Sequence, residues 1–424
     1  MTLERNRRWV SKDRLTDVAL FLAGFLSVAP QVHNARFGAG FETFAVAHNL
    51  VQHGQYANPF PIATGASALL PPLYPIFLAL LMKVFQPAAE FATALTLCHM
   101  MAHGLHAALL PRLSELFFRD RLPGICAAFV VVLFPILYFF PHSESIFCPV
   151  GLMLFCLATD RRLARGGAGG ALFTGLFAGL LVLLNPACVI VCVLWLAYLM
   201  WRNRMAYARR SAVLITLAFL ATLAPWTWRN YRQFQSIFFV RDNLGLELYI
   251  SNNDLAQPDI VRNFPTGMRY FHPGNSRAEA TAVRDLGEVE YAHQRLSSAL
   301  GWIRGHPRHF FTLTLLRIGL FWFPDAEGFT PVHGFAVAFV TLAGLMGIVL
   351  MVRRHVPIAG FLVAILTLFP LLYYVVQIDA RYRTPILWLS LLSTGYAIAA
   401  VLVAVSPEPA ARLETTIPQL HLLD

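Results

Sequence analysis

About ten stretches of this 424-residue chain are apolar enough and long enough to lie in the hydrocarbon of a membrane. The chain is 57% hydrophobic and only 13% charged, with a mean hydropathy of +0.58, so a soluble fold could not bury its apolar surface. We therefore expect an all-α polytopic membrane protein, a bundle of about 10–12 transmembrane or re-entrant helices. The expected spans are 15–33, 91–111, 123–140, 143–159, 171–185, 187–201, 211–228, 335–352, 357–377 and 384–405.

The charged residues predict how these spans are oriented. Basic residues outnumber acidic ones by 33 to 23, and nearly all are arginines in short loops between apolar runs. This distribution is typical of membrane topology, whereas a nucleic-acid-binding protein gathers its charge on one soluble face. Both termini are expected in the cytoplasm, together with the basic loops 112–121, 160–165, 202–210 and 353–354. The polar segments then face outward, at 34–90, 140–145, 229–309 and 378–383.

Three stretches need a separate interpretation. Residues 72–86 are short and begin with two prolines, so we expect them to lie in the interface or to re-enter. Residues 310–323 are expected to form an interfacial or broken helix. Residues 171–201 have basic residues on both flanks, so they must hold two short crossings joined near Asn185-Pro186.

The predicted organisation has two membrane modules separated by a polar lid. The N-terminal module spans residues 1–228 and includes the first outward loop at 34–90. The lid spans 229–309, the C-terminal module 310–405 and the cytoplasmic tail 406–424. The lid mixes strand-like pieces at 236–240 and 246–250 with a helical stretch near 277–304. We therefore expect a small extracytoplasmic α/β segment.

The cysteines and histidines imply no metal or other cofactor. All six cysteines fall in or at the ends of apolar runs, where a free cysteine acts as a small hydrophobe, so no disulfide framework or zinc site is expected. His99, His103 and His106 share one face of an expected span. No carboxylate in that span completes a metal site, and neutral histidines can hydrogen-bond across helices.

Glu42 is the sharpest candidate for chemistry. It begins an amphipathic pattern at 41–51 (FETFAVAHNLV), which predicts a helix in the interface with Glu42, His48 and Asn49 on its polar face. An acid beside a membrane is costly to desolvate unless it has a function, although a solvated surface glutamate is the plain alternative. The prolines and glycines that follow fix a non-helical path typical of binding loops.

Four motifs in a consistent order carry a family resemblance. The first outward loop contains Arg36, Glu42-Thr43, Asn58-Pro59, Thr64-Gly65 and Pro72-Leu73-Tyr74-Pro75. The later motifs are His142-Ser143-Glu144-Ser145, Pro225-Trp226-Thr227-Trp228-Arg229-Asn230-Tyr231 and Arg381-Tyr382-Arg383-Thr384-Pro385. Over about residues 10–405 the chain resembles the C-type membrane glycosyltransferases (the GT-C fold). It is most similar to their bacterial branch related to protein O-mannosyltransferases and aminoarabinose transferases.

The resemblance implies transfer of a sugar, with inversion, from a polyprenyl-phosphate donor to an acceptor glycan, lipid or protein. It places the protein in a bacterial inner membrane, among membrane lipids, with its active site facing the periplasm. Glu42 would be the general base and Glu144 would help to orient the acceptor, since a single displacement needs only one base. The donor phosphate would be held by Arg381, Arg383, Arg229 and Arg36, whose planar forks suit phosphate. The substrate-lining residues would be His48, Asn58, Tyr74, His142, Tyr231 and Tyr382.

The chain departs from the family pattern at two positions. Phe41 precedes Glu42 where many members carry Asp-Glu, and Leu70 precedes the prolines where some members carry a phosphate-binding lysine. The base assignment therefore depends on Glu42 alone. For Arg381 and Arg383 the alternative is snorkelling to headgroups, and for Glu144 it is a simple polar turn.

Two other classes of protein compete with the enzyme. A polytopic transporter or lipid-linked sugar flippase usually hides ionisable groups at mid-membrane and often has related halves. Apart from the three histidines these spans contain almost no charge, and no internal repeat is visible. A non-enzymatic envelope scaffold is the third possibility, but the clustering of polar features on one face argues mildly against it.

Overall fold

The computed structural model describes residues 2–30, 42–137, 144–203, 208–324 and 331–405. Within these ranges the chain is helical and contains no strand; two isolated bridges join Ala57 to Ala66 and Asp259 to Ile378. The helices of the first half are α1 Thr2–Ser27, α3 Glu42–His53, α4 Leu73–Val84, α5 Ala88–Phe118, α6 Leu122–Leu133, η1 Pro135–Leu137, η2 Glu144–Ile146, α7 Phe147–Ala164, α8 Ala168–Leu184, α9 Cys188–Asn203 and α10 Ala208–Phe234.

The second half continues with short helices and then returns to long ones. Its elements are α11 Leu244–Ser251, α12 Ile260–Asn263, η3 Phe264–Met268, α13 Arg269–Phe271, α14 Arg277–Leu286, α15 Glu288–Gly305, α16 Pro307–Trp322, α17 Pro331–Arg353, α18 Ala359–Leu368, η4 Phe369–Leu372, η5 Ala380–Arg383 and α19 Thr384–Val405. The expected all-α class is confirmed.

The expected α/β segment is wrong. Residues 246–250 belong to α11, residues 236–240 form no strand, and the stretch near 277–304 is helical as expected, in α14 and α15. Leu246 and Ile250, four residues apart, are both buried, as on one face of a helix. Short apolar runs do not distinguish strand from helix, and packing against α15 decides the outcome here.

Among the described residues, three helices are long and apolar enough to cross a membrane, namely Arg209–Phe234, Pro331–Arg353 and Ala380–Val405. The expected spans 123–140, 171–185, 187–201 and 357–377 contain shorter apolar helices, whereas 15–33, 91–111 and 143–159 fall on the long helices α1, α5 and α7, which are less apolar. Helices α6 and α18 are shorter than the runs that predict them, because Pro135 and Pro370 follow their ends and shift the chain into 3₁₀ turns. Helix α4 has 12 residues, about 18 Å of helix against a hydrocarbon thickness of about 30 Å.

The expected junction between two short helices is confirmed. Helix α8 ends at Leu184, Asn185 adopts an extended backbone, and α9 begins at Cys188. Of segment 310–323, residues 310–322 lie in the single helix α16, which begins at Pro307, and Phe323 follows its end. Expectations that fall on residues 31–41, 138–143 and 406–424 lie outside the described residues.

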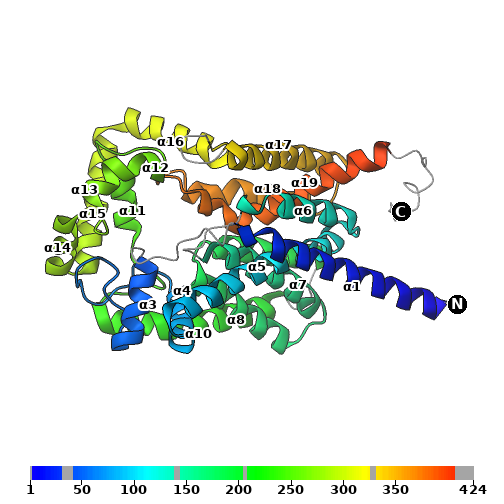
Figure 1. The fold of residues 1–424 in the computed structure, drawn as a ribbon, viewed down its shortest axis with the longest axis horizontal. Coiled ribbons are helices and arrows are strands. Elements are labelled where there is room, and N and C mark those ends of the chain that lie inside the picture. Colours follow the sequence, from blue (N-terminus) through cyan, green and yellow to red (C-terminus); the bar gives the residue numbers. More distant parts are fainter. Residues whose placement is uncertain (1, 31–41, 138–143, 204–207, 325–330, 406–424) are drawn as a thin grey trace.

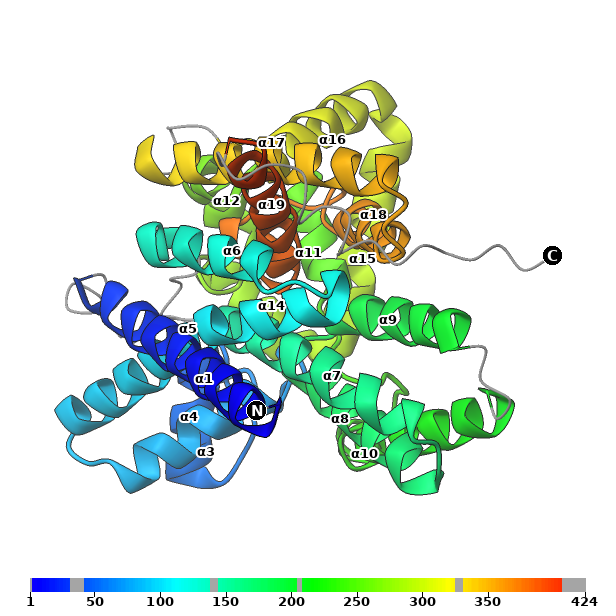
Figure 2. The ribbon, with the colours of Figure 1, turned by 90° about the vertical axis from the view of Figure 1, so that its right-hand side faces the viewer.

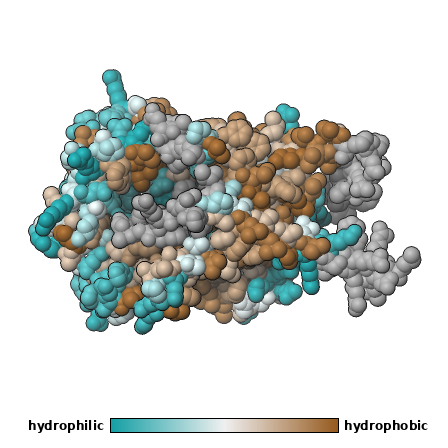
Figure 3. All heavy atoms as spheres, viewed as in Figure 1, coloured by the Kyte–Doolittle hydropathy of each residue, from teal (hydrophilic) through white to brown (hydrophobic). Residues whose placement is uncertain are grey.

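The molecule has a helical bundle and, at one end, an outer cap. We define the outer cap as residues 42–72 of the first loop and 235–305 of the lid (Figure 1). The cap lies at the end opposite to both termini, and hydrophilic residues gather over it while apolar residues cover the bundle (Figure 3). Seen along the long axis, α17 and α19 lie on one side of the bundle and α7, α8 and α10 on the other (Figure 2).

The first loop and the lid share one small apolar core. Phe60 and Leu69 of the loop pack in one cluster with residues of α11, η3, α14 and α15, namely Leu246, Ile250, Met268, Ala280, Val283 and Tyr291. These two segments are separated by more than 150 residues of chain. The cap is therefore a joint structure of loop and lid, built over the end of the bundle.

Candidate functional site

Glu42 lies where the first loop meets the lid. It is the first residue of α3, and its side chain is 26% exposed. Its Oε1 lies 3.5 Å from Nε2 of His272, which follows α13 in the lid. The backbone N–H of Gly274 donates to Nδ1 of His272 at 2.9 Å, so in the neutral ring the proton is on Nε2 and faces the carboxylate. His272 is a partner that the sequence analysis missed.

Glu144 lies in a second cluster, formed by separate elements of the bundle. The amide of Asn185, between α8 and α9, donates to its Oε1 at 2.9 Å. The ring of Tyr74 lies 5.9 Å from that of Phe147, three residues after Glu144. Glu144 is therefore held by a specific partner, which a simple polar turn does not require.

Tyr74 is the most unusual member of this cluster. It is only 3% exposed, and within the described part of the chain its hydroxyl has no hydrogen-bond partner. A buried polar group without a partner costs stability, and an ordered water, an ion or a bound ligand can satisfy it. Phe44, two residues after Glu42, packs in the same apolar cluster as Tyr74, which links α3 to this site.

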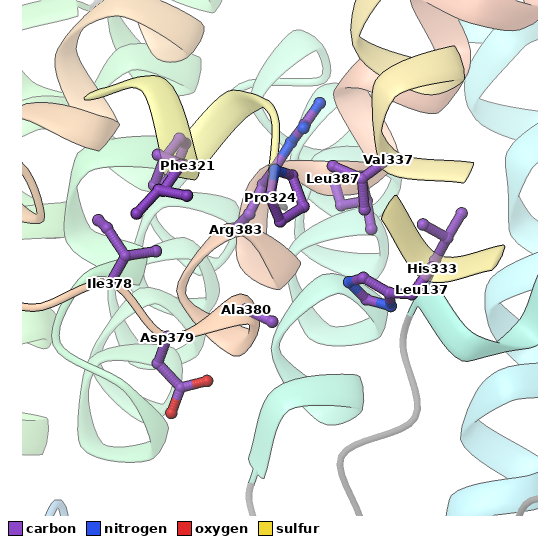
Figure 4. A pocket seen from close by; sticks show the side chains of 11 residues that line it. Leu137, Phe321, Pro324, His333, Val337, Ile378, Asp379, Ala380, Arg383 and Leu387 are labelled. Atoms are coloured by element: carbon purple, nitrogen blue, oxygen red, sulfur yellow. The ribbon is translucent and has the colours of Figure 1, made fainter. Parts of the chain in front are cut away.

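The two arginines of the last outward turn differ in their surroundings. Nε of Arg381 donates to Asp379 at 2.9 Å, and its side chain remains 41% exposed. Arg383 is 5% exposed; it donates to Oγ1 of Thr341 at 2.7 Å and lies over the ring of Trp322. It therefore does not snorkel toward headgroups. Figure 4 shows Asp379 and Arg383 pointing apart around a cavity of about 30 Å³.

Arg229 and Asn58 organise the first loop. The guanidinium of Arg229 donates to the carbonyl oxygens of Ser67 and Tyr56, each at 2.8 Å. Oδ1 of Asn58 accepts from the backbone N–H of Gly65 at 2.8 Å, and its amide donates to Asn49. Arg229 was expected to hold the donor phosphate and Asn58 to line the substrate. Both side chains instead form hydrogen bonds within the chain itself.

The remaining candidates are dispersed. His48 is exposed on α3, whereas Asn49, expected on the same polar face, is buried. Tyr231 is 39% exposed, with its ring 5.9 Å from that of Trp228, and Tyr382 stacks on Tyr373 at 4.6 Å. Arg36 and His142 lie outside the described residues. Among the described residues no hydrogen bond or ion pair joins Glu42 to Glu144.

Glu288 is a buried acid that the sequence analysis did not single out. It is the first residue of α15, is 8% exposed and accepts from the backbone N–H of Ala68 at 2.5 Å. Burial raises the pKa of Glu288 to about 7. Hydrogen bonds from Ser67 and Ala68 lower the pKa, but their effect is smaller than that of burial. Tyr291 and Ala292, three and four residues later, are buried too, so helical periodicity could have placed Glu288 on the inner face.

Two of the three histidines of α5 contact backbone carbonyls. Nδ1 of His103 lies 3.0 Å from the oxygen of Gly24 on α1, which confirms the expected hydrogen bond across helices. Nδ1 of His99 lies 2.9 Å from the oxygen of Leu95, within its own helix. Within the described residues no group of three or more His, Cys, Asp or Glu side chains is placed to hold a metal ion.

Comparisons with known proteins add no family. The chain matches no protein-family model, and no curated protein matches it. A function can therefore be proposed only from the side chains and their positions.

Proposed function

We propose that this protein is a multi-pass glycosyltransferase of a bacterial inner membrane, with both termini cytoplasmic and its site facing the periplasm. It would transfer a sugar, with inversion, from a polyprenyl-phosphate donor to an acceptor outside the cytoplasm. One observation carries the proposal: the buried hydroxyl of Tyr74, unpartnered among the described residues, belongs to a ring 5.9 Å from that of Phe147, three residues after the Glu144 held by Asn185, and Arg381 keeps a part-exposed guanidinium. An acid, a hydrogen-bond donor and a cation are the groups that a phosphate-linked sugar and a hydroxyl acceptor need.

The proposed reaction is a single displacement. The acceptor hydroxyl oxygen forms a bond to the anomeric carbon, its proton passes to the Glu42 carboxylate, and the bond from that carbon to the phosphate oxygen breaks. The electron pair leaves with the polyprenyl phosphate, whose charge Arg381 stabilises. Glu42 suits the role of base because its carboxylate is part-exposed to an acceptor and held by the Nε2–H of His272.

The contacts narrow the proposed set of phosphate ligands. Arg229 already donates to two backbone carbonyls, and Arg383 is buried against Thr341 and Trp322. Arg381 donates to Asp379 through Nε but keeps a guanidinium that is 41% exposed, so we assign the donor phosphate to Arg381. Glu144, fixed by Asn185, orients the acceptor.

Replacing the base tests this function. Glu42→Gln and Glu42→Ala should reduce transfer of a radiolabelled sugar from polyprenyl phosphate by about 100-fold or more, because general-base catalysis contributes about 10²–10⁴. Glu290→Gln, an exposed acid in the same cap, is the matched control and should transfer at the wild-type rate. Full activity of Glu42→Gln rejects the base assignment. Movement of a solute across a reconstituted vesicle without consumption of a sugar lipid favours the transporter instead.

A further inference from the structure

Arg317 is a fully buried cation in α16. Its side chain is 0% exposed, and among the described residues no carboxylate forms an ion pair with it. Its guanidinium donates to Oδ1 of Asn252 at 3.1 Å and to the carbonyl oxygen of Ser251, both at the end of α11 in the lid. Burying a charge without an opposite charge costs stability, and an apolar side chain would fill the same place at a lower cost. The two contacts with the lid therefore give the arginine its role.

The same two lid residues hold a segment that precedes the last outward turn. The amide of Asn252 donates to the carbonyl oxygen of Val375 at 2.9 Å, and the backbone N–H of Gln377 donates to Oγ of Ser251 at 2.8 Å. We call residues 375–378 the clamped segment. Each of the two lid residues thus contacts the buried arginine with one oxygen and the clamped segment with another polar atom.

A second element of the lid reinforces this attachment. The amide of Asn263, in α12, donates to Oε1 of Gln377 at 2.7 Å. The backbone of Ile378 accepts from the N–H of Ile260 at 2.9 Å and donates to the carbonyl oxygen of Pro258 at 2.8 Å. Every residue of the clamped segment except its second is therefore bound to the lid by a hydrogen bond.

The clamped segment leads directly into the residue that orients Arg381. Asp379 is the next residue, and its carboxylate accepts from the backbone N–H of Arg381 at 3.1 Å and from Nε of Arg381 at 2.9 Å. A continuous path of hydrogen bonds and one peptide bond thus connects the buried arginine of α16 to the guanidinium that is assigned to the donor phosphate.

We propose that Arg317 is a positioning residue for the donor phosphate. By holding the end of α11 against the clamped segment, it fixes the position of Asp379 and, through Asp379, that of the Arg381 guanidinium. The inference rests on the proposed function and deepens it, because it names the part of the lid that places the phosphate ligand. Such a residue matters far from the chemistry, since a misplacement of about 1 Å can cost about 100-fold in rate.

A double-mutant cycle separates positioning from a purely structural role. Arg317→Met keeps an apolar side chain and removes both donors, so the affinity of full-length protein in nanodiscs for a fluorescent polyprenyl phosphate should fall about tenfold. In an Arg381→Ala background the same substitution should change the affinity less than about twofold, because the guanidinium that it positions is absent. Arg308→Met, an exposed arginine of the same helix, is the control and should bind as the wild type does. An equal loss in both backgrounds overturns the proposal.

A milder variant covers the case in which Arg317→Met does not fold. Ser251→Ala removes the Oγ that accepts from Gln377 but keeps the carbonyl oxygen that accepts from Arg317. Hydrogen exchange at the Gln377 amide should accelerate, and the affinity for polyprenyl phosphate should fall about threefold. Ser297→Ala, an exposed serine of α15, should change neither. Faster exchange with unchanged affinity shows that the clamped segment serves the fold alone, which overturns the proposal.

The positioning role and the proposed function can fail separately. If Arg381→Ala weakens binding but neither Arg317→Met nor Ser251→Ala does, the positioning role is wrong and the phosphate assignment stands. If Arg381→Ala binds polyprenyl phosphate as the wild type does, the phosphate assignment is wrong and the positioning role falls with it. Thermal unfolding of each variant in detergent identifies any that has lost its fold.

Discussion

The bundle and the outer cap are held together by different physical means. In the bundle, helix backbones approach closely at glycines: a Cβ added at Gly347 would lie 1.9 Å from the oxygen of Ser393, and one at Gly395 would lie 1.9 Å from that of Pro123. At the cap, Arg229 of α10 and Glu288 of α15 bond to backbone atoms of the first loop more than 150 residues away. Shape complementarity therefore stabilises the bundle, whereas the cap adds to its small apolar core a few polar contacts that can respond to pH.

The largest effect is expected where a side chain is forced between two bundle helices. Gly347→Leu should destabilise the protein by about 3 kcal/mol or more, because overpacking a tight contact displaces α17 from α19. The thermal unfolding midpoint in detergent measures the loss. Gly360→Leu, in α18, is the control, since no atom lies within 4 Å of a Cβ added there. Equal midpoints for the two variants would contradict the role of close packing.

A smaller and local effect is expected in the cap. Arg229→Met removes hydrogen bonds to the carbonyl oxygens of Ser67 and Tyr56 and should cost about 2 kcal/mol of local stability. Hydrogen exchange should accelerate at residues 56–70 while the amides of α17 and α19 keep their protection. Arg232→Met, an exposed arginine of the same helix, should change neither. Uniformly faster exchange would show that cap and bundle unfold as one unit.

The cap should also weaken as pH rises. Burial holds the pKa of Glu288 near 7, above its ordinary value of 4.5, so the folded cap binds a proton that the unfolded chain releases first. The stabilisation of the folded cap by protonated Glu288 is fully present below about pH 4.5 and is lost as pH rises through 7. Burial also raises the pKa of Asp242, so this residue too destabilises the folded cap as pH rises. Arg229 lowers the pKa of Glu288 and His293 lowers that of Asp242, and both therefore reduce the loss.

Exchange at residues 66–70, corrected for the intrinsic rate, measures this pH dependence between pH 5 and 8. Glu288→Gln should flatten the profile, because its side chain stays neutral at every pH. Glu290→Gln is the matched control, an exposed acid two residues later that should keep the wild-type profile. An unchanged slope in Glu288→Gln would assign the pH dependence to another group.

The same contrast explains what could be predicted from the sequence. The apolar runs predicted the bundle helices, and Asn185-Pro186 predicted a junction, because hydropathy and proline act locally. The partners themselves, His272 for Glu42 and Ala68 for Glu288, could not be predicted, since contacts across 220 residues or more leave no local pattern. Glu42, Glu144 and Arg381 were singled out because charges at the ends of apolar runs are conspicuous. Their partners are ordinary polar residues.

Breaking the contact between Glu42 and His272 should have the smallest effect on the stability of the protein. It should nevertheless lower the rate of sugar transfer measurably. His272→Phe removes the Nε2–H that faces the carboxylate but keeps a ring against Phe60, so the unfolding midpoint should change little. The kcat for sugar transfer should fall about tenfold, equivalent to about 1.4 kcal/mol, while KM for the donor stays constant. His272→Asn, which retains an N–H donor, should restore part of the rate.

This variant distinguishes a contact that positions the base from one that only holds the cap. His309→Phe, an exposed histidine of α16, is the control and should leave kcat, KM and the unfolding midpoint unchanged. If His272→Phe instead accelerates exchange at residues 56–70 as Arg229→Met does, with kcat unchanged, then His272 serves the cap and not the base. Glu42 would in that case act without a partner from the lid, and the polar contacts of the cap would all be structural.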